Sequence, residues 1–335
     1  LSLYNKLHYN TIYHKPMTML QSIIALVSSF VLIIYSANSL IDNGNKIASI
    51  YKVSPFIIGV LILGFGTSAP EIFVSAFAAF EDASELAVGN AFGSNILNIA
   101  LVLGITAMIF PITVNVKAIR KDWYFLITFT LITGGLLWDR HLGVIDGSIL
   151  LGLLGIFLWH TFNESKKVHH KSDNLSSNVD ISQKGKIWRN LLFWLIVLLG
   201  SAQFIVFAGK NIAIYFQVSE MIIGLTLIAL GTSLPELAVA ITSAIKKQHE
   251  MVVGNIIGSN IFNTVAVLAI PGLISPVAVP EEIKIDYLTM LILTIFLYLF
   301  FLIEFFNKQK ETISRLEGFA LIMILSAYIY SRFLV

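Results

Sequence analysis

The sequence predicts an all-α integral membrane protein, whose ten transmembrane helices form two five-helix repeats of inverted topology. Three observations support this fold: an apolar composition, a series of long apolar runs and an internal duplication. Hydrophobic residues make up 56% of the 335 residues and charged residues only 13%. A soluble domain carries about 25% charged residues. This chain therefore has too few polar side chains to cover a water-facing surface.

Charge and cysteine content exclude several classes of function. The net charge is only +2, which gives no basic field for nucleic acid. The chain has no cysteine, which excludes disulfide frameworks, iron–sulfur clusters, thiolate zinc sites and cysteine nucleophiles. We expect no cofactor, no nucleic-acid partner and no obligate protein partner, and we expect the lipid bilayer to surround the chain.

The predicted helices follow from the length of the apolar runs. Residues 1–18 form a leader too polar for a signal peptide, and we leave them outside the fold. Crossing the hydrocarbon core takes about 20 apolar residues. Continuous runs without strand-like alternation predict helices rather than barrel strands. The ten runs are 19–41, 54–80, 86–112, 122–138, 143–162, 190–215, 217–245, 250–275, 286–306 and 313–335.

The positive charges set the expected orientation. Of the 22 Lys and Arg residues, 16 fall on the side that holds the odd-to-even connections, including the polar linker 163–189. Because positive charges accumulate in cytoplasmic loops, we expect this linker in the cytoplasm and both termini outside. The expected membrane is the plasma membrane, which is the inner membrane of a prokaryote.

The chain contains an internal duplication. Residues 53–111 align without gaps to residues 218–276, with 26 identities in 59 positions. The matched cores are GTSAPE and GTSLPE, followed by GNAFGSNILN and GNIIGSNIFN. Polar residues that match in register are not a coincidence of composition. The two repeats are 19–162 and 190–335, joined by the linker 163–189.

The two repeats should enter the membrane from opposite sides, since each contains an odd number of spans. Loop charge supports the inversion independently. The loop after the first core carries Glu81, Asp82 and Glu85, whereas the equivalent loop carries Lys246 and Lys247. Inverted repeats are typical of secondary transporters, with the substrate site near the membrane midplane.

One acidic residue lies inside each repeat core. Glu71 is the only charged residue between Lys52 and Glu81, and Glu236 is the only one between Glu220 and Lys246. A charge at this depth is costly and is a functional hypothesis by default. The structural alternative is a neutral, hydrogen-bonded Glu, which two equivalent positions disfavour.

The surroundings of each Glu predict a hard-cation site. A Pro precedes each Glu and disrupts the helix, which turns carbonyls of the preceding turn outward, those of Thr67 and Thr232 among them. On the following helix the residues expected to face the cation are Ser94, Asn98, Ser259 and Asn263. For Asn90, Asn95, Asn255 and Asn260, a ligand role and a role in holding helices together remain equally open.

The oxygen count points to Ca²⁺ and Na⁺. Two carboxylates and the two Thr carbonyls provide oxygens of the kind Ca²⁺ prefers, and two negative charges neutralise one divalent cation. No Cys or His lies near the Glu pair, which disfavours soft transition metals. Several Na⁺ ions can share the same oxygens, so the two ions would exclude one another.

These motifs resemble the α-repeats of the calcium/cation antiporter superfamily, and the layout over residues 19–335 is similar to the bacterial and archaeal sodium/calcium exchangers. The resemblance implies antiport of Ca²⁺ against Na⁺ by alternating access, without enzymatic activity or a cofactor. It implies Glu71 and Glu236 as central ligands, with a surrounding set of Thr67, Thr232, Ser94, Ser259, Asn98 and Asn263. Gly64 and Ala229 occupy the family's remaining backbone-carbonyl positions.

One residue departs from the family's pattern. Some members carry Asp where this chain has Asn263, which matters for the number of bound cations only if that Asp is ionised.

A proton/calcium antiporter using the same carboxylates is the main alternative. A channel is disfavoured by the inverted Glu-bearing repeats. An intramembrane hydrolase with a carboxylate dyad gives no reason for the Ser and Asn residues.

Overall fold

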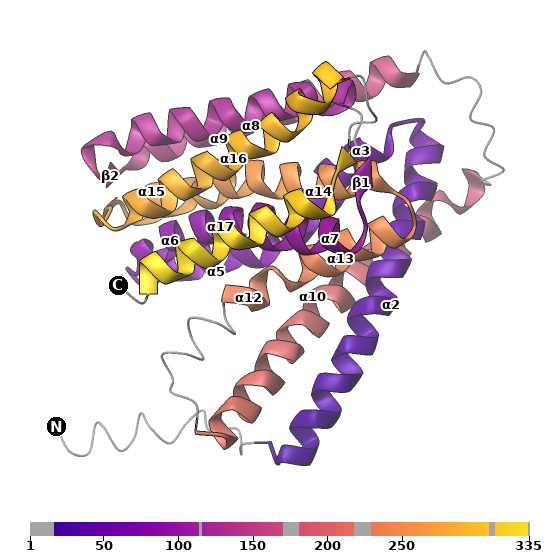
Figure 1. Ribbon diagram of the computed structural model, residues 1–335, viewed down its shortest axis with the longest axis horizontal. Helices are drawn as coiled ribbons and strands as arrows, with labels where there is room; N and C mark the ends of the chain where they lie inside the picture. The colour runs from indigo at the N-terminus through magenta and orange to yellow at the C-terminus, as the bar shows by residue number, and fades with distance from the viewer. Residues whose placement is uncertain (1–16, 114–115, 170–180, 218–228, 308–311, 334–335) are drawn as a thin grey trace.

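The computed structural model describes residues 17–113, 116–169, 181–217, 229–307 and 312–333, and these form a helical bundle (Figure 1). The described helices of the N-terminal half are α2 (Met19–Tyr51), α3 (Pro55–Ile58), η1 (Gly59–Gly64), α4 (Phe65–Thr67), α5 (Ala69–Phe80), α6 (Ser84–Leu97), η2 (Asn98–Leu103), α7 (Gly104–Ile109), α8 (Val116–Leu136), η3 (Leu137–Asp139) and α9 (Val144–His169). Those of the C-terminal half are η4 (Ile181–Gln183), α10 (Lys184–Tyr215), α12 (Ala229–Thr232), α13 (Leu234–Ile245), α14 (His249–Phe262), η6 (Asn263–Val267), α15 (Ala269–Ile274), α16 (Ile283–Asn307) and α17 (Arg315–Phe333).

The helices agree with the predicted membrane protein. Within the described residues, six stretches are long and apolar enough to cross a membrane. They are Met19–Tyr51, Pro55–Phe80, Ser84–Ile109, Val144–Glu164, Lys184–Tyr215 and His249–Ile274. The other four predicted spans contain the helices α8, α12 with α13, α16 and α17. The count of ten crossing helices stays a prediction.

Several helices extend beyond their predicted ends. Helix α2 continues ten residues past the predicted end at 41 and ends at Tyr51, where Lys52 adopts the left-handed conformation as its C-cap. Within the extension, Asn43 donates to the Ser39 carbonyl at 2.7 Å. Helix α9 runs on to His169 and α10 starts at Lys184, so both enter the range predicted as linker. The rest of that linker, 170–180, and residues 1–16 of the leader lie outside the described residues.

The helix is interrupted at the same place in both halves, as the Pro residues predict. Helix α4 ends at Thr67 and α5 begins at Ala69, with Pro70 in its first turn; α12 ends at Thr232 and α13 begins at Leu234. The residues between them, Ser68 and Ser233, have nearly the same backbone angles. Because proline has no N–H, the first turn of a helix is the position that tolerates it best.

Backbone contact between η1 and α14 fixes the centre of the bundle. A Cβ added to Gly258 would lie 2.7 Å from the Val60 carbonyl oxygen, and one added to Gly64 would lie 2.9 Å from the Ser259 nitrogen. Only glycine allows this approach. Gly89 and Gly93 of α6 differ from this pair, since nothing described lies within 4 Å of an added Cβ at either residue.

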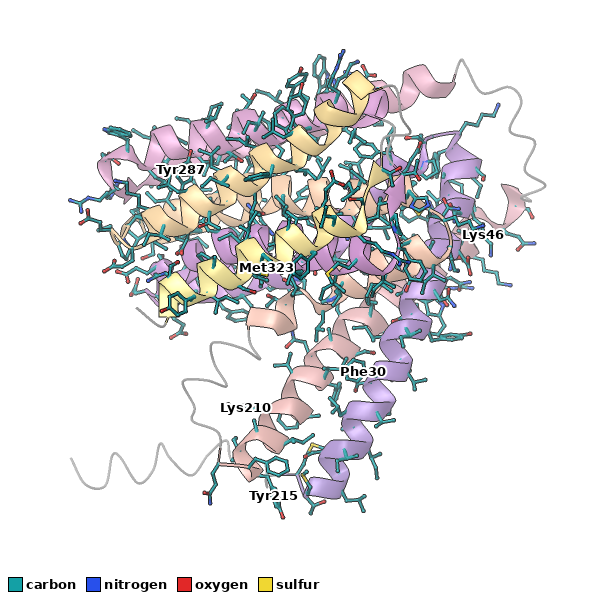
Figure 2. The ribbon with its side chains drawn as sticks, in the orientation of Figure 1. Phe30, Lys46, Lys210, Tyr215, Tyr287 and Met323 are labelled. Atoms are coloured by element: carbon teal, nitrogen blue, oxygen red, sulfur yellow. The ribbon has the colours of Figure 1, made fainter. Side chains whose placement is uncertain are left out.

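Helices α2 and α10 lie side by side and stand obliquely away from the other helices (Figure 1). One core cluster fills the main bundle, and a second joins α2 and α10 to η1. Phe30 and Tyr215 lie on the part of this helix pair that extends beyond the bundle (Figure 2), and both are exposed apolar side chains suited to lipid.

Two short antiparallel ribbons connect the halves. Strand β1 (Ile112–Thr113) pairs with β4 (Thr312–Ile313), and β2 (His141–Leu142) pairs with β3 (Val277–Ala278). Strands β1 and β3 are equivalent in the duplicated sequence, and β2 and β4 each precede the last helix of their half. Each half therefore contributes one strand to each ribbon.

Candidate cation site

Two carboxylates are buried where the broken helices meet. Glu71 lies in the first turn of α5 and Glu236 in the first turn of α13, and both are 0% exposed. The two groups lie near enough for their charges to interact. Each stands at a helix N-terminus, where the unpaired N–H groups favour negative charge. The structure thus brings together the two acidic residues that the sequence singled out.

Most of their oxygens have no hydrogen-bond partner among the described residues. The Ser94 hydroxyl donates to Glu71 Oε1 at 3.4 Å, while Glu71 Oε2 and both carboxylate oxygens of Glu236 accept nothing there. Asn90 Nδ2 donates to the backbone carbonyl of Glu71, at 3.2 Å, and not to its carboxylate. Leaving a buried charged acceptor unpaired costs more than about 1–3 kcal/mol, unless a ligand supplies the missing contact.

A π-helix, whose turns are wider than those of an α-helix, follows α6 in one half and α14 in the other. The π-helices η2 and η6 begin at the equivalent residues Asn98 and Asn263, which are 1% and 0% exposed. Both side-chain amides lack hydrogen-bond partners among the described residues, at oxygen and nitrogen alike. Wide turns of this kind are frequent at functional sites. The sequence singled out the two asparagines but not the change of helix type.

The hydroxyls on the η1 side are engaged with the backbone. Thr67 Oγ1 lies 2.9 Å from the Leu63 carbonyl, to which it donates, 3.3 Å from Asn255 Oδ1 and 3.4 Å from Ser259 Oγ. Ser259 Oγ donates to the Gly64 carbonyl at 3.2 Å. This network joins both halves and positions the Thr67 and Gly64 turns beside α14.

The remaining predicted residues are less fully placed. Thr232 is partly buried at the end of α12, and Ala229 is the first residue of that helix, its side chain outside the described part. Two buried serines outside the predicted ligand set, Ser68 and Ser233, have hydroxyls without a partner in the described structure. The signal for them was present, since both motifs read GTSxPE.

The asparagines whose role was left open all contact a neighbouring helix. Asn95 Nδ2 donates to Thr264 Oγ1 at 2.9 Å, and Asn260 Nδ2 lies 3.5 Å from the Asn95 carbonyl, so this pair holds α6 against α14 and η6. Asn90 fixes the Glu71 backbone and Asn255 contacts Thr67. All four make contacts between helices of the site, but the side-chain oxygens of Asn95 and Asn260 have no partner among the described residues, so a ligand role stays open.

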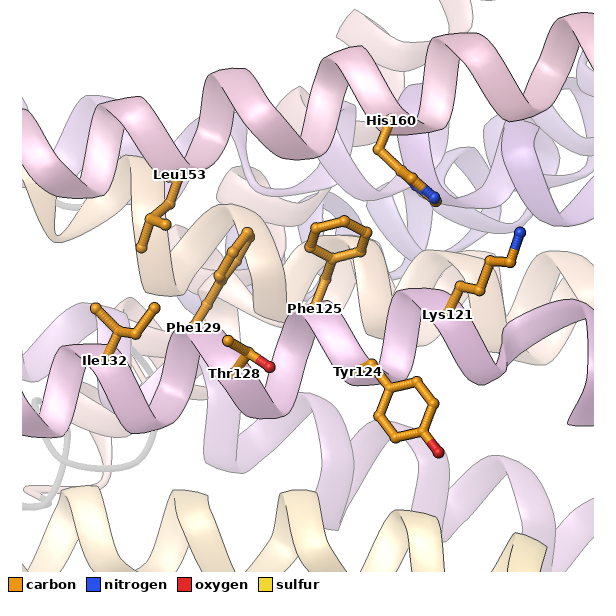
Figure 3. A pocket seen from close by; sticks show the side chains of 8 residues that line it. All are labelled: Lys121, Tyr124, Phe125, Thr128, Phe129, Ile132, Leu153 and His160. Atoms are coloured by element: carbon orange, nitrogen blue, oxygen red, sulfur yellow. The ribbon is translucent and has the colours of Figure 1, made fainter.

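The donor set matches a hard cation. In the described residues, no three His, Cys, Asp or Glu side chains cluster as a metal site. Two carboxylates among neutral amide, hydroxyl and carbonyl oxygens are the ligands of Ca²⁺ or Na⁺ rather than of soft metals. A cavity of about 310 Å³ between α8 and α9 (Figure 3) contains none of these residues and is lined mainly by apolar side chains such as Phe125 and Phe129.

Comparison with known proteins identifies the family. The family model described as sodium/calcium exchanger protein matches residues 21–163 and 187–334. The inner membrane protein YrbG of Escherichia coli is 34% identical over 83% of this chain and 87% of its own length. The sodium/calcium exchanger MaX1 of Methanosarcina acetivorans is 25% identical over 92% of this chain and 97% of its own length.

The solved structures agree with the sequence comparison. A structure of the sodium-calcium exchanger NCX_Mj superimposes with a TM-score of 0.79 at 31% identity. The match covers 92% of this chain and 97% of that chain. The fold and the sequence therefore point to one group of transporters, in which cations are the cargo and no enzymatic reaction takes place. We conclude that the chain belongs to the sodium/calcium exchanger family and is a multi-helix membrane protein that exchanges cations.

Proposed function

We propose that this protein exchanges Ca²⁺ for Na⁺ across the membrane, with both ions competing for one site between Glu71 and Glu236. The observation that carries the proposal is the buried carboxylate pair, three of whose four oxygens lack a hydrogen bond from any described residue. The unpaired amides of Asn98 and Asn263 supply further oxygens. Family membership and the fold of NCX_Mj support the same function.

Charge balance explains why exchange is obligatory in this proposal. Two ionised carboxylates neutralise one Ca²⁺, and more than one Na⁺ can occupy the same oxygens. Without a cation the site carries two buried negative charges, and burying unpaired charge is costly. The empty protein therefore changes its orientation slowly. The site holds either Ca²⁺ or Na⁺, not both together, and alternates between the two faces of the membrane.

Helices α2 and α10 are the proposed moving element. They pack against each other along their length, and at one end the Trp188 Nε1–H donates to the Tyr51 hydroxyl at 3.3 Å. The Lys184 ammonium lies 4.4 Å from the centre of the Tyr51 ring. These contacts tie the two helices together, so that they slide as one unit past the central helices.

Loop charge supports a specific orientation in the membrane. We place the 163–189 segment in the cytoplasm and both termini outside, in the plasma membrane of a prokaryote, which is its inner membrane. The inward Na⁺ gradient of such a cell then drives Ca²⁺ outward. No partner beyond the two ions and the surrounding lipid is required for this cycle.

The test is ⁴⁵Ca²⁺ uptake into proteoliposomes loaded with Na⁺ and diluted into Na⁺-free buffer. Parallel vesicles contain K⁺, choline or an acid interior. We expect uptake only with internal Na⁺, loss of uptake in Glu71→Gln and Glu236→Gln, and normal uptake in the exposed control Glu85→Gln. Uptake driven by the acid interior would instead establish proton coupling, and retained exchange in both Gln variants would refute the site.

A further inference from the structure

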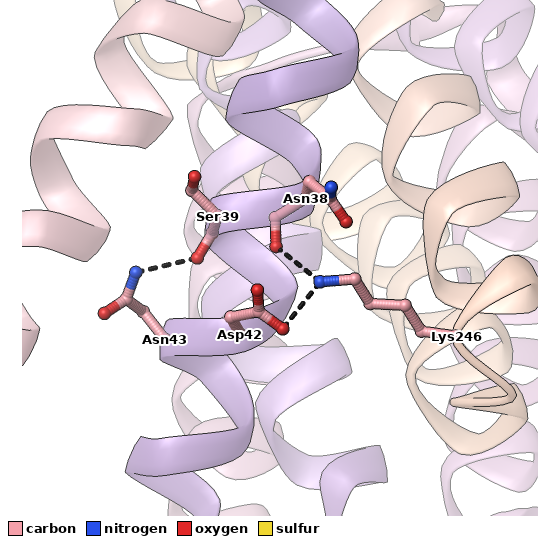
Figure 4. Close-up of polar contacts among 5 residues, drawn as sticks. All are labelled: Asn38, Ser39, Asp42, Asn43 and Lys246. Atoms are coloured by element: carbon pink, nitrogen blue, oxygen red, sulfur yellow. Dashed lines mark hydrogen bonds and ion pairs between the residues drawn. The ribbon is translucent and has the colours of Figure 1, made fainter.

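A charged contact attaches α2 to the end of α13. The Lys246 ammonium donates to Asp42 Oδ1 at 2.6 Å and to the Asn38 carbonyl at 3.0 Å (Figure 4). Lys246 caps the C-terminus of α13, and Asp42 lies in the second half of α2. The Lys246 side chain is 23% exposed and that of Asp42 58%. This is a contact between the proposed moving pair and the central helices.

The duplication places a second set of charges at the equivalent positions. In the 165-residue offset that relates the halves, Lys246 corresponds to Glu81 and Asp42 to Phe207. Lys210 lies about one turn after Phe207 on α10. Because long side chains on a helix lean back over the preceding turn, the side chain of Lys210 extends toward Phe207. A cation therefore lies near the position equivalent to Asp42. Glu81, an acid, occupies the position equivalent to Lys246.

This second contact is not made in the structure. Helix α2 packs along α13, whereas α10 makes no comparable contact with α5 in the described part of the chain. On α5, Phe77 is 69% exposed, while the equivalent Thr242 on α13 is only 8% exposed. Lys210 lies on the end of α10 that stands away from the bundle (Figure 2), and no ion pair of Lys210 or Glu81 occurs among the described residues.

We propose that Asp42–Lys246 and Glu81–Lys210 are reciprocal positioning pairs, one closed in each of the two orientations of the transport cycle. The proposal rests on the proposed exchange function. Inverted repeats allow the two halves to trade conformations, so that the contact made by one half here is made by the other half after the switch. Because α2 and α10 move together, closing one pair opens the other. The charges are complementary in both pairs, with the acid and the base interchanged.

The expected effect of each pair is modest. Partly exposed ion pairs contribute up to about 1 kcal/mol, which corresponds to about a two- to five-fold change in the ratio of the two orientations. Neither pair contacts the cation, so loss of a pair alters the exchange rate and leaves equilibrium cation affinity nearly unchanged. Loss of a contact with only a structural role would not change the exchange rate while leaving cation affinity unchanged.

Crosslinking tests the second contact directly, because the chain has no cysteine of its own. Glu81→Cys with Phe207→Cys should react with a short bifunctional thiol reagent in membranes and thereby stop exchange. Asp42→Cys with Lys246→Cys is the positive control. Adding Lys246→Gln to the Glu81→Cys, Phe207→Cys variant removes the Asp42–Lys246 pair. It should therefore raise crosslinking between the two cysteines about two- to five-fold. Crosslinking only in the control, under both Na⁺ and Ca²⁺, would overturn the proposal.

Charge exchange provides a test that does not depend on cysteine variants. We expect Glu81→Lys and Lys210→Glu each to slow exchange, and the double variant to recover it, although the two side chains are apart in this structure. Glu85→Lys combined with Lys210→Glu is the matched control, which should not recover. Equal rates in the rescued and control doubles would refute the reciprocal pairs. Crosslinking requires no transport, so it separates failure of the pairs from failure of the proposed exchange function.

Discussion

Replacement of Gly258 by alanine tests the contact on which the site is built. This glycine lies on α14 against η1, the segment that leads to Gly64 and Thr67. An added Cβ would lie 2.7 Å from the Val60 carbonyl oxygen and 2.8 Å from the Val60 Cα, inside the 3.4 Å at which ordinary contact begins. Both atoms belong to the backbone, so no side-chain rotation relieves the overlap.

The expected loss follows from two opposing terms. Overpacking of this kind costs about 1–3 kcal/mol. Alanine gains about 1 kcal/mol over glycine inside a helix. The net loss is about 0–2 kcal/mol, which lowers the ratio of folded to unfolded protein by as much as about 30-fold. If η1 moves instead, the Gly64 and Thr67 carbonyls move with it and exchange falls.

The assay combines thermal unfolding of purified protein with Na⁺-driven ⁴⁵Ca²⁺ uptake. The control is Gly155→Ala, at an exposed position within α9 where nothing described lies within 4 Å of an added Cβ. We expect Gly258→Ala to be destabilised or slow, and Gly155→Ala to be unchanged or slightly more stable. A Gly258→Ala protein that matches the wild type in both measurements would refute the close-contact reasoning.

Three further predictions follow from the site and the moving helices. Ca²⁺ at 100 times its Kd should raise the unfolding free energy by about 2.7 kcal/mol, and Glu236→Gln should abolish this stabilisation in a thermal-shift assay. Ser94→Ala removes the one hydrogen bond that a described residue donates to the Glu71 carboxylate. It should change apparent Ca²⁺ affinity about two- to ten-fold in a ⁴⁵Ca²⁺ competition assay, a larger change than Ser331→Ala causes at an exposed position of α17. Trp188→Phe keeps an aromatic ring but loses the indole N–H that donates to the Tyr51 hydroxyl, and should lower the unfolding free energy by about 0.5–1.5 kcal/mol; unchanged stability would contradict the role of that bond in joining α2 to α10.

Much of the fold was predictable because a membrane allows few solutions. Apolar runs of about 20 residues must be helices in lipid, and the positions of Pro70 and Pro235 predicted the interruptions that the structure shows. The ends of α2 and α10 were not predictable from hydropathy. The part of α2 beyond residue 41 contains polar residues such as Asn43, whose amide bonds within the helix, and hydropathy does not register such bonds.

The site was predictable as a set of residues but not as an arrangement. Two isolated Glu residues in a duplicated motif indicated a cation site, and the structure buries both. The π-turns that begin at Asn98 and Asn263 have no recognised signal in a single sequence, since they depend on how neighbouring helices pack. The contacts of individual asparagines were equally hidden, because Asn95, whose amide nitrogen bonds to Thr264, and Asn98, whose amide has no partner among the described residues, differ only in the helix face they occupy.

The two β-ribbons have a consequence for the origin of the chain. Each ribbon joins a strand of one half to a strand of the other, so the halves are interlocked in the manner of a domain-swapped dimer. A half-length polypeptide inserted in both orientations could form the same two pairings between separate copies. The central linker would then be a covalent tie added to an antiparallel homodimer. Co-expressed halves, cut within 170–180, should accordingly reassemble through the ribbons and the α6–α14 contact.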